Sequence, residues 1–456
     1  YFGSGIHPLR PAIVLMLRGF FGVLTHPTDW VEATKRFWKR TVSGDDRIRR
    51  LIVKGPPPLF EEFLTRQLLR PHWGAAQRRR RKKLISLLVA WHRGEISHSH
   101  STMRVHEYLS VGKGNHDSWF DLLGLSRVLM SVGLFRASLD SQRRAWELLE
   151  SEVWRKPTLF TRYNYLLSLI YRGEIALAHR ELETLTTMRH YPPITAAIPF
   201  LRWYLGVCSS SENQSVPWNV QGRNQPRWLE RVAGQDVLIY GPGEVGNLPA
   251  LRGGFLVSRI MGPGVFEWNN RDDLVSNQTN LVYSIRENID NAMAPGGSTI
   301  LEVLEKYDFV CVKKTDSFQS SHSRAVNAFS PLFSRGHPQM VPLAILDLIS
   351  SGANPVVIGS DFFTSQIAYR PSDRRIAASM RESAEEKRQS AEGSDGGSFD
   401  RTSLMASHNI LENWALIRNL FASGLVRGDS RFSAVMSMDP EQLMDVYDQN
   451  LGARRI

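Results

Sequence analysis

Cysteine is nearly missing from this chain of 456 residues, which contains only Cys208 and Cys311. Two cysteines so far apart in the sequence cannot form the disulfide framework of a small secreted protein. No cluster of Cys and His residues has the spacing of a zinc site either. A reducing compartment is therefore the simplest setting, and we expect neither a structural metal nor a cofactor that depends on one.

Long apolar runs are missing as well. The longest run, Pro11 to Pro27, is interrupted by Arg18 and is shorter than the roughly 20 residues that span a bilayer. Gly and Pro together make up 57 residues, too few for a collagen-like or low-complexity chain. With 42% hydrophobic and 10% aromatic residues, the chain can form two or three domains with cores of their own.

Positive charge is concentrated in the first half of the chain. Residues 1–230 carry 34 Lys and Arg against 19 Asp and Glu, whereas residues 231–456 carry 22 against 26. The net charge of +11 is thus the balance of +15 and −4. The densest basic cluster, Arg78 to Lys83, predicts contact with anionic lipid head groups or with nucleic acid phosphates, unless it is simply a solvated helix face.

An apolar helical pattern that ends in glycine recurs at Gly94, Gly133 and Gly173, at intervals of 39 and 40 residues. A second helical pattern follows, as at 137–149 and 176–185, so each unit resembles a helical hairpin with a glycine turn. Stacked hairpins of this period are typical of tetratricopeptide-like solenoids. We predict a basic helical-repeat domain over 1–225, with repeats near 84–190. An irregular helical bundle is the alternative.

The second half changes character after a polar linker at 209–227. Short, apolar and β-branched runs alternate with helical stretches, which favours a mainly parallel sheet in an α/β domain over 226–456. The predicted helices include 297–307, 339–351 and 409–422, and the polar stretch 371–402 reads as a mobile loop. The predicted strands are 237–240, 255–257, 281–283, 309–312 and 356–358.

The first predicted strand ends in Gly241-Pro242-Gly243, within a formal G-x-G-x-x-G match that extends to Gly246. Only 11 residues separate Gly243 from Phe255, too few for the crossover helix of a nicotinamide-binding unit. What the pattern still predicts is a glycine-rich turn at the carboxyl edge of a parallel sheet, where bare backbone can approach a nucleotide. A tight turn with no ligand is the alternative.

Two further motifs follow along the chain. A predicted strand leads into Gly359-Ser360-Asp361, where the Asp361 carboxylate either orients a ligand hydroxyl or caps the following turn. Ser407 and His408 come directly before a predicted helix. A histidine at a helix N-terminus is held neutral by the helix dipole and is suited to removing a hydroxyl proton, unless it serves only as a cap.

Taken in this order, the motifs resemble those of the bacterial sialyltransferases of glycosyltransferase family 42. The resemblance covers about 200 residues, from Asp236 to Met438. It implies a modified, Rossmann-like nucleotide-binding fold, a CMP-activated sugar donor and inverting transfer without a metal. It also implies that His408 is the catalytic base, that Tyr369 steadies the leaving phosphate, and that 371–402 is a lid over the site.

Several residues depart from the pattern of that family. Phe363 takes the place of a tyrosine, and Pro242 and Ser284 take the places of asparagines that hold the nucleotide and the sugar. The remaining donor-binding positions implied by the resemblance are Gly241, Gly243, Gly359, Ser360 and Asp361. The departures favour a related acidic sugar, such as another nonulosonic acid or a Kdo-like sugar, as readily as sialic acid.

The first interpretation is therefore a CMP-sugar-dependent transferase that acts on a glycan or lipid-linked acceptor. We expect it to be cytoplasmic and peripheral at the inner face of the membrane. Nucleic acid is not an expected partner. A second interpretation is a non-catalytic solenoid scaffold fused to a degenerate nucleotide-binding domain. A third, an NADP-dependent oxidoreductase with Arg259 near a 2′-phosphate, is disfavoured by the short first crossover.

Overall fold

A computed structural model describes residues 75–110, 117–188, 192–210, 224–241, 245–250, 254–260, 279–285, 307–313, 322–326, 329–334, 338–365 and 408–452, with a few single positions such as Leu64, Gly243 and Met405. Several predictions lie outside these residues: the helix at 297–307 except its last position, the tyrosine at 369, the lid at 371–402 and the proline at 242. The apolar run at 11–27 lies outside them too.

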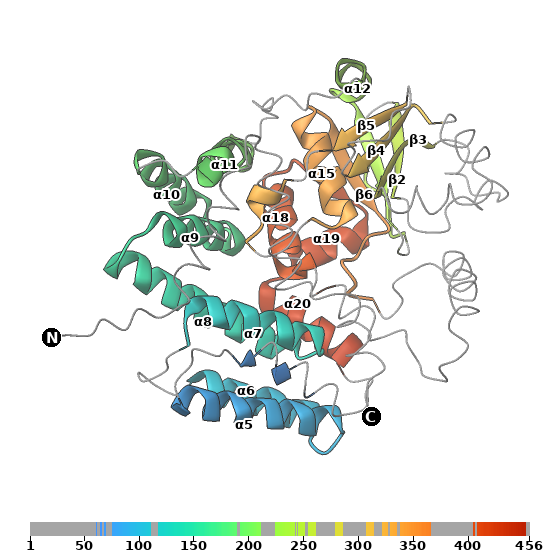
Figure 1. Ribbon diagram of the computed structural model, residues 1–456. Coiled ribbons are helices and arrows are strands. Elements are labelled where there is room, and N and C mark those ends of the chain that lie inside the picture. Colours follow the sequence, from blue (N-terminus) through green and yellow to red (C-terminus); the bar gives the residue numbers. More distant parts are fainter. Residues whose placement is uncertain are drawn as a thin grey trace, which may run out of the picture.

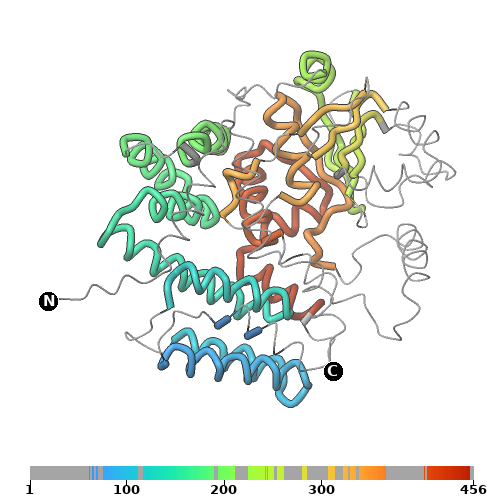
Figure 2. The backbone as a smooth tube through the Cα atoms, in the orientation of Figure 1, coloured from blue at the N-terminus to red at the C-terminus, as the bar shows by residue number. Residues whose placement is uncertain are grey.

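The first half of the described chain is helical, as predicted. Figure 2 follows it from the bottom of the molecule to the top left, with each helix packed on a neighbour along the chain. Its helices are α5 (Ala75–His92), α6 (His98–Ser110), α7 (Trp119–Ser131), α8 (Phe135–Arg155), α9 (Leu159–Arg172), α10 (Ile175–Thr187) and α11 (Pro192–Ser210).

Glycine turns join three pairs of these helices. Gly94 lies between α5 and α6, Gly133 between α7 and α8, and Gly173 between α9 and α10, with φ angles of 73°, 82° and 77°. These angles lie in the left-handed region, which side chains other than glycine disfavour. The three predicted glycine turns are thus observed, whereas the descent of the hairpins from one sequence repeat stays a prediction.

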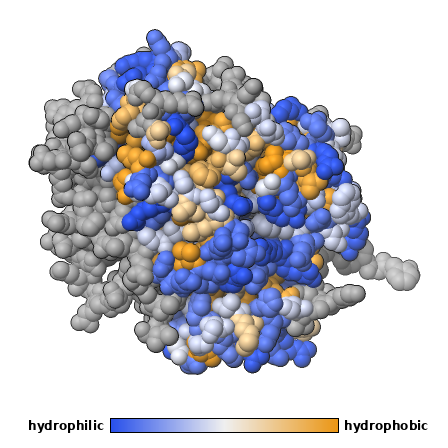
Figure 3. Space-filling model, turned by 180° about the vertical axis from the view of Figure 1, so that it is seen from behind, coloured by the Kyte–Doolittle hydropathy of each residue, from blue (hydrophilic) through white to orange (hydrophobic). Residues whose placement is uncertain are grey.

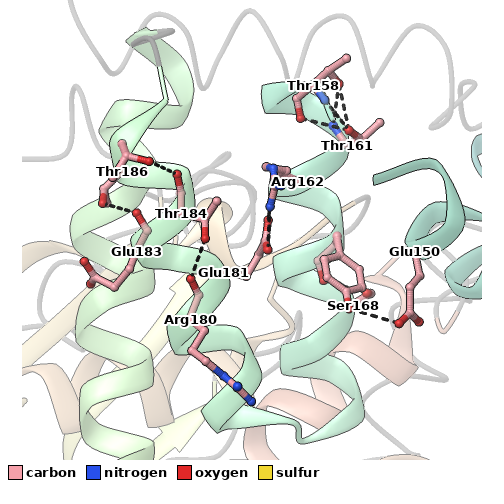
Figure 4. Close-up of polar contacts among 12 residues, drawn as sticks. Glu150, Thr158, Thr161, Arg162, Ser168, Arg180, Glu181, Glu183, Thr184 and Thr186 are labelled. Carbon is pink, nitrogen blue, oxygen red and sulfur yellow. Dashed lines mark hydrogen bonds and ion pairs between the residues drawn. The ribbon is translucent and has the colours of Figure 1, made fainter. Parts of the chain in front are cut away.

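The hairpin of α9 and α10 shows how such a pair is held together. The Nη1 atom of Arg162 donates to both carboxylate oxygens of Glu181, at 2.8 and 3.0 Å, across the two helices (Figure 4). Both side chains are largely buried, so the pair is less screened than a surface ion pair. At the start of α9, Thr158 and Thr161 cap each other's backbone N–H groups.

The second half contains a seven-stranded sheet in which every pairing is parallel. Its elements, several of them labelled in Figure 1, are α12 (Gln225–Val232), β1 (Asp236–Tyr240), β2 (Phe255–Ile260), β3 (Thr279–Ile285), β4 (Phe309–Lys313), β5 (Ser323–Val326), η3 (Ser330–Leu332), α15 (Met340–Ser350), β6 (Asn354–Ile358), α18 (Ile410–Ala422), β7 (Arg427–Gly428), α19 (Ser430–Ser437), α20 (Pro440–Tyr447) and η4 (Asp448–Gly452).

The five predicted strands are all present as β1, β2, β3, β4 and β6, and the helices predicted at 339–351 and 409–422 are α15 and α18. The sheet also contains β5 and β7, which the sequence did not reveal. Each is at an edge of the sheet and is short, and neither has an apolar run. The polar linker is shorter than predicted, because α11 extends to Ser210 and α12 begins at Gln225.

The hydrophobic core is continuous between the two halves. Figure 1 shows α18 between the helices of the first half and the sheet, and it packs against α9, α11, α15 and α19. Tyr204 of α11 donates its buried hydroxyl to the carbonyl of Leu416, and Asn419 of α18 donates to the carbonyl of Ile170 in α9. The helical half therefore contributes directly to the position of α18.

The rear view gives the surface of the described residues. In Figure 3, hydrophilic residues form a broad band across the lower half of this face, and hydrophobic residues gather in patches above it. A surface that mixes hydrophilic and hydrophobic residues is usual for a folded protein, because a chain has too few polar atoms to cover its whole surface.

A buried polar network links the sheet to its covering helices. Arg324 of β5 donates to both oxygens of Asp347 in α15, at 2.5 and 3.1 Å, and Tyr283 of β3 donates to the same carboxylate at 2.7 Å. The Arg324 guanidinium also stacks on the ring of Trp228, 4.2 Å from its centroid. Both charged side chains are 1% exposed, so each needs its partner to compensate for lost hydration.

Removing one partner of this pair should destabilise the whole sheet. We predict that Asp347→Ala lowers the free energy of unfolding by about 3–5 kcal/mol, because it leaves Arg324 charged and buried without its carboxylate. Urea denaturation followed by circular dichroism measures the change. The matched control is Asp308→Ala, which removes the half-exposed pair with Arg231 and should cost less than about 1 kcal/mol. Equal losses in the two variants would contradict this assignment.

Candidate functional site

The strand order reverses between β1 and β6. The sheet runs β5-β4-β3-β2-β1-β6-β7, so the chain moves outward in one direction from β1 to β5 and in the other from β6 to β7. In open parallel sheets, ligands bind outside the carboxyl ends of the strands at the point of this reversal. The topology therefore indicates a candidate binding site at the residues that follow Tyr240 and Ile358.

Both glycine motifs of the sequence lie at this point and contact each other. The N–H of Gly241 donates to the carbonyl of Ile358 at 2.8 Å, and the N–H of Gly243 donates to the carbonyl of Gly359 at 2.7 Å. A Cβ atom on Gly241 would lie 2.5 Å from the Gly359 oxygen. Glycine is thus required here for the approach of two backbone turns, and this packing accounts for the motif before any ligand is considered.

Gly359 has a second reason to be glycine. Its φ of 61° lies in the left-handed region, and a Cβ atom on it would lie 2.7 Å from the carbonyl oxygen of Gly243. The two turns therefore fit together only without side chains at these positions. Gly241, Gly243 and Gly359 are buried, so the two turns pack tightly against each other at the carboxyl end of the sheet.

A buried carboxylate fastens this edge. One oxygen of Asp429, Oδ2, accepts from the N–H groups of Gly359 and Gly246 at 2.8 and 2.9 Å, and the other accepts from the N–H of Phe432 at 2.8 Å. The Asp429 N–H donates to the carbonyl of Val357 in β6. Asp429 is fully buried and is the N-cap of α19. One side chain thus joins the β1 turn, the β6 turn and a helix N-terminus.

The Asp361 carboxylate caps the turn in which Asp361 itself lies. Its carboxylate accepts from the N–H groups of Phe363 and Ser365, at 3.0 and 3.1 Å, which is the capping role that the sequence analysis left open. Phe362 and Phe363 have positive φ angles of 51° and 66°. Strained residues of this kind persist only where the surroundings fix them.

The surroundings that fix the turn come from α20 and the segment after it. The hydroxyl of Tyr447 donates to the carbonyl of Phe362, and the amide of Asn450 donates to the carbonyl of Thr364, at 2.6 and 2.5 Å. Burial holds the pKa of Tyr447 well above its ordinary value, and the nearby Asp361 carboxylate raises it further, so the hydroxyl keeps its proton.

The other predicted donor-binding residues are placed differently. Ser284 lies in β3 and is fully buried, so its hydroxyl faces protein and not an open edge. Ser360 and Phe363 are half-buried at the β6 turn. Gly241, Gly243, Gly359, Ser360 and Asp361 are thus brought together, whereas Ser284 lies within β3 and not at these turns.

His408 lies at the start of α18 and is half-buried. Its carbonyl accepts from the Asn413 side-chain amide at 2.6 Å, and the Asn413 oxygen accepts from the N–H of Gln339 at 2.9 Å. Gln339 is the N-cap residue of α15, which runs back from the carboxyl edge to β6. Asn413 is fully buried, so it fixes the backbone of His408 against the N-terminus of a second helix.

Lys313, the last residue of β4, ties this region to the sheet. Its buried Nζ atom donates to the carbonyl of Pro338 at 2.9 Å, just before α15. The N-termini of α15, α18 and α19 therefore all lie on the carboxyl side of the sheet. The N-terminus of α19 already has the Asp429 carboxylate, whereas the partial positive charge at the N-termini of α15 and α18 favours an anion on this side.

A buried carboxylate lies one turn after His408. Glu412 accepts from the hydroxyl of Ser334, whose N–H donates to the hydroxyl of Tyr171 in α9 at 2.9 Å. Burial raises the pKa of Tyr171, and the charge of Glu412 raises it further. Burial lowers the pKa of Arg127 to about 10, and Glu412 partly opposes that shift. The helical half thus contacts α18 through polar groups as well as apolar ones.

Sequence reasoning missed Asp429, Asn413, Glu412 and Lys313. An aspartate after Gly428 has the pattern of an N-cap, and that signal was available, but its contacts with the β1 and β6 turns are long-range. Asn413 and Glu412 lie inside a helical pattern, in which a polar side chain is predicted to be solvent-exposed. Their burial depends on the packing of the helical half.

The basic cluster of α5 is not uniformly exposed. Arg81 is 1% exposed and forms an ion pair with Asp117 at 2.9 Å, and Arg80 donates to the carbonyl of Tyr108. Arg78, Arg79, Lys82 and Lys83 are exposed. The prediction of one six-residue surface cluster is therefore wrong for Arg81, because a helix that packs on a neighbour turns every third or fourth residue inward.

No group of three or more His, Cys, Asp or Glu side chains in the described part of the chain is arranged to hold a metal ion. Among the helices that the structure describes, none combines the length and apolarity needed to cross a bilayer. A scan against protein-family models, a search of curated proteins and a search of solved structures returned no match to this chain. The arguments for function therefore come from the residues and their geometry.

Asp429→Asn tests whether this carboxylate organises the edge. An amide keeps one acceptor oxygen, so at least one of the three N–H groups loses its partner. We predict a loss of about 1–3 kcal/mol in the free energy of unfolding, together with weaker binding of any ligand at the β1 and β6 turns. Urea denaturation and calorimetric titration with CMP measure the two effects.

The control is Asp439→Asn, since Asp439 is also an aspartate N-cap, but of α20 and on an exposed turn. It should cost about 1 kcal/mol or less and leave ligand binding unchanged. If Asp429→Asn changes stability but not binding, Asp429 supports only the fold.

Proposed function

We propose that this chain is an inverting glycosyltransferase that moves an acidic sugar from a CMP-activated donor to a hydroxyl of a glycan or lipid-linked acceptor. The observation that carries the proposal is that two interlocked glycine turns and the N-termini of α15 and α18 lie on the carboxyl side of the sheet, with His408 next to the N-cap residue of α18. Such an edge suits the phosphate of a nucleotide sugar.

The chemistry follows from a histidine beside an anion site. The imidazole of His408 takes the proton of the acceptor hydroxyl as that oxygen attacks the anomeric carbon. The bond between that carbon and the phosphate oxygen breaks, and CMP leaves with the electron pair. Helix N-termini stabilise the negative charge that develops on the leaving phosphate, and the Tyr369 hydroxyl is proposed to donate to it.

The class of donor rests on the resemblance to family 42, as does the Rossmann-like identity of the sheet. The coarser inference, a nucleotide at the β1 and β6 turns, rests on topology. Sialic acid is one candidate sugar, and a related nonulosonic acid or a Kdo-like sugar fits equally well, because Phe363 offers no hydroxyl and Ser284 is buried away from the edge. The helical hairpins are proposed to hold the acceptor.

A non-catalytic nucleotide-binding scaffold is the second candidate. It is favoured by the Asp361 carboxylate, which bonds to its own turn, and by the packing role of the glycines. Such a protein would bind CMP without turning over a CMP-sugar. Binding and turnover therefore separate the two candidates.

Nucleotide selectivity is the first test of the proposal. We expect CMP to bind at least tenfold more tightly than UDP or NADP, because the motif order matches a cytidine-nucleotide transferase and the loop from Gly243 to Phe255 is too short for a dinucleotide-binding crossover. Isothermal titration calorimetry with the three ligands measures the difference. A tenfold preference for NADP or UDP would contradict the proposal.

Substitution of His408 tests catalysis. We predict that His408→Ala lowers turnover of a CMP-sugar by roughly 100-fold to 10,000-fold, the range for losing a positioned base, and leaves CMP affinity unchanged. The acidic limb of the pH profile should also disappear, since that limb reports protonation of the base. His179→Ala, a substitution on α10, is the control and should leave both unchanged. Wild-type turnover in His408→Ala would end the assignment.

A further inference from the structure

Two large aromatic side chains are exposed around the turn between α8 and α9. Trp154 is 73% exposed and Phe160 is 51% exposed. Between them, Arg155, Lys156, Pro157 and Thr158 are exposed as well. A tryptophan with so much of its surface in water gives up the stabilisation that burial of an indole provides, and a partner surface restores it.

The basic part of α5 lies at the same end of the helical array. Trp119 at the start of α7 packs on Phe160, with ring centroids 5.6 Å apart. Asp117, two residues earlier, is the partner of Arg81. The beginning of α5, the beginning of α7 and the turn between α8 and α9 therefore meet at one end, on the left of Figure 1.

This end carries exposed positive charge. Its exposed basic side chains are Arg78, Arg79, Lys82, Lys83, Arg155 and Lys156. Among its described acidic side chains, Asp117 is buried against Arg81, and Asp121 forms the capping box of α7 with Ser118. Glu152 is half-buried on α8. Among the described residues at this end, the exposed charge is thus predominantly basic, and Trp154 and Phe160 lie on either side of Arg155 and Lys156 in the chain.

We propose that this end of the helical half docks on an anionic lipid surface, with Trp154 and Phe160 entering the interfacial region and the six exposed basic residues facing the head groups. Trp is enriched at membrane interfaces because its ring is apolar and its N–H is polar. Basic residues add attraction to anionic lipids that falls off within a Debye length. The proposal does not depend on the glycosyl-transfer assignment.

The aromatic pair favours lipid over nucleic acid. A nucleic acid site needs a groove along which phosphates and stacked bases alternate. Here the rings and the charges share one helical end and one exposed turn, which suits a flat, deformable surface. Four of the basic residues follow one face of α5, spaced i, i+1, i+4 and i+5, so they approach a plane together.

Vesicle sedimentation with the full chain tests the proposal. Wild-type protein should bind vesicles of phosphatidylglycerol and phosphatidylcholine and bind pure phosphatidylcholine at least tenfold more weakly, with binding to the anionic vesicles reduced in high salt. Trp154→Ala should weaken binding to anionic vesicles by about tenfold. Arg155→Gln/Lys156→Gln should weaken it by about 30-fold, since each charge contributes about 1 kcal/mol.

Two control variants test whether a loss of vesicle binding is specific to this end of the helical half. Leu229→Ala removes an exposed apolar side chain from α12, and Arg180→Gln/Arg202→Gln removes two exposed charges from α10 and α11, and both should bind as wild type does. Trp154→Phe should keep most of the affinity but lose a blue shift of fluorescence on binding. Circular dichroism confirms that each variant folds.

The proposal is overturned if wild-type protein binds neither vesicle, if Trp154→Ala and Leu229→Ala behave alike, or if neutral and anionic vesicles bind equally. It is also overturned if single-stranded RNA competes for the same surface at lower concentration than the vesicles and Trp154→Ala weakens RNA binding instead.

Discussion

The buried carboxylate of Asp429 is the contact on which the candidate site depends. It holds the turn after β1, the turn after β6 and the N-terminus of α19 through three backbone N–H groups. These elements are far apart in the sequence, and each brings N–H groups that lose water when the protein folds. A single charged acceptor satisfies all three, which is why the two turns can pack tightly at the strand reversal.

The helical half supports the same site through its contacts with α18 and with the segment around η3. Its tyrosines bond to the segment around η3, as when Tyr163 donates to the carbonyl of Pro331, and that segment contacts Glu412 of α18. Within α18, Asn413 joins His408 to the start of α15. The position of His408 is therefore set by both halves, and a fragment beginning at α12 would lose the helices against which α18 packs.

Much of the fold could be predicted from the sequence, because buried parallel strands and glycine-ended helices leave local signals. The runs at Val237, Phe309 and Val356 are apolar on both faces, and Gly133 and Gly173 end helices in the left-handed conformation. The site was less predictable, because Asp429 and Asn413 act through contacts between distant segments. Arg81 shows the same limit, since a run of basic residues gives no sign of which one faces inward.

The central claim is that a cytidine nucleotide binds at the turns after β1 and β6, beside the start of α18. Hydrogen–deuterium exchange of the full chain, with and without saturating CMP, tests it without any assumption about the reaction. CMP should slow exchange in peptides covering 240–250, 358–365 and 408–413 and leave α5 and α6 unchanged. Protection confined to the helical half, or none at a concentration that saturates binding, would contradict the account.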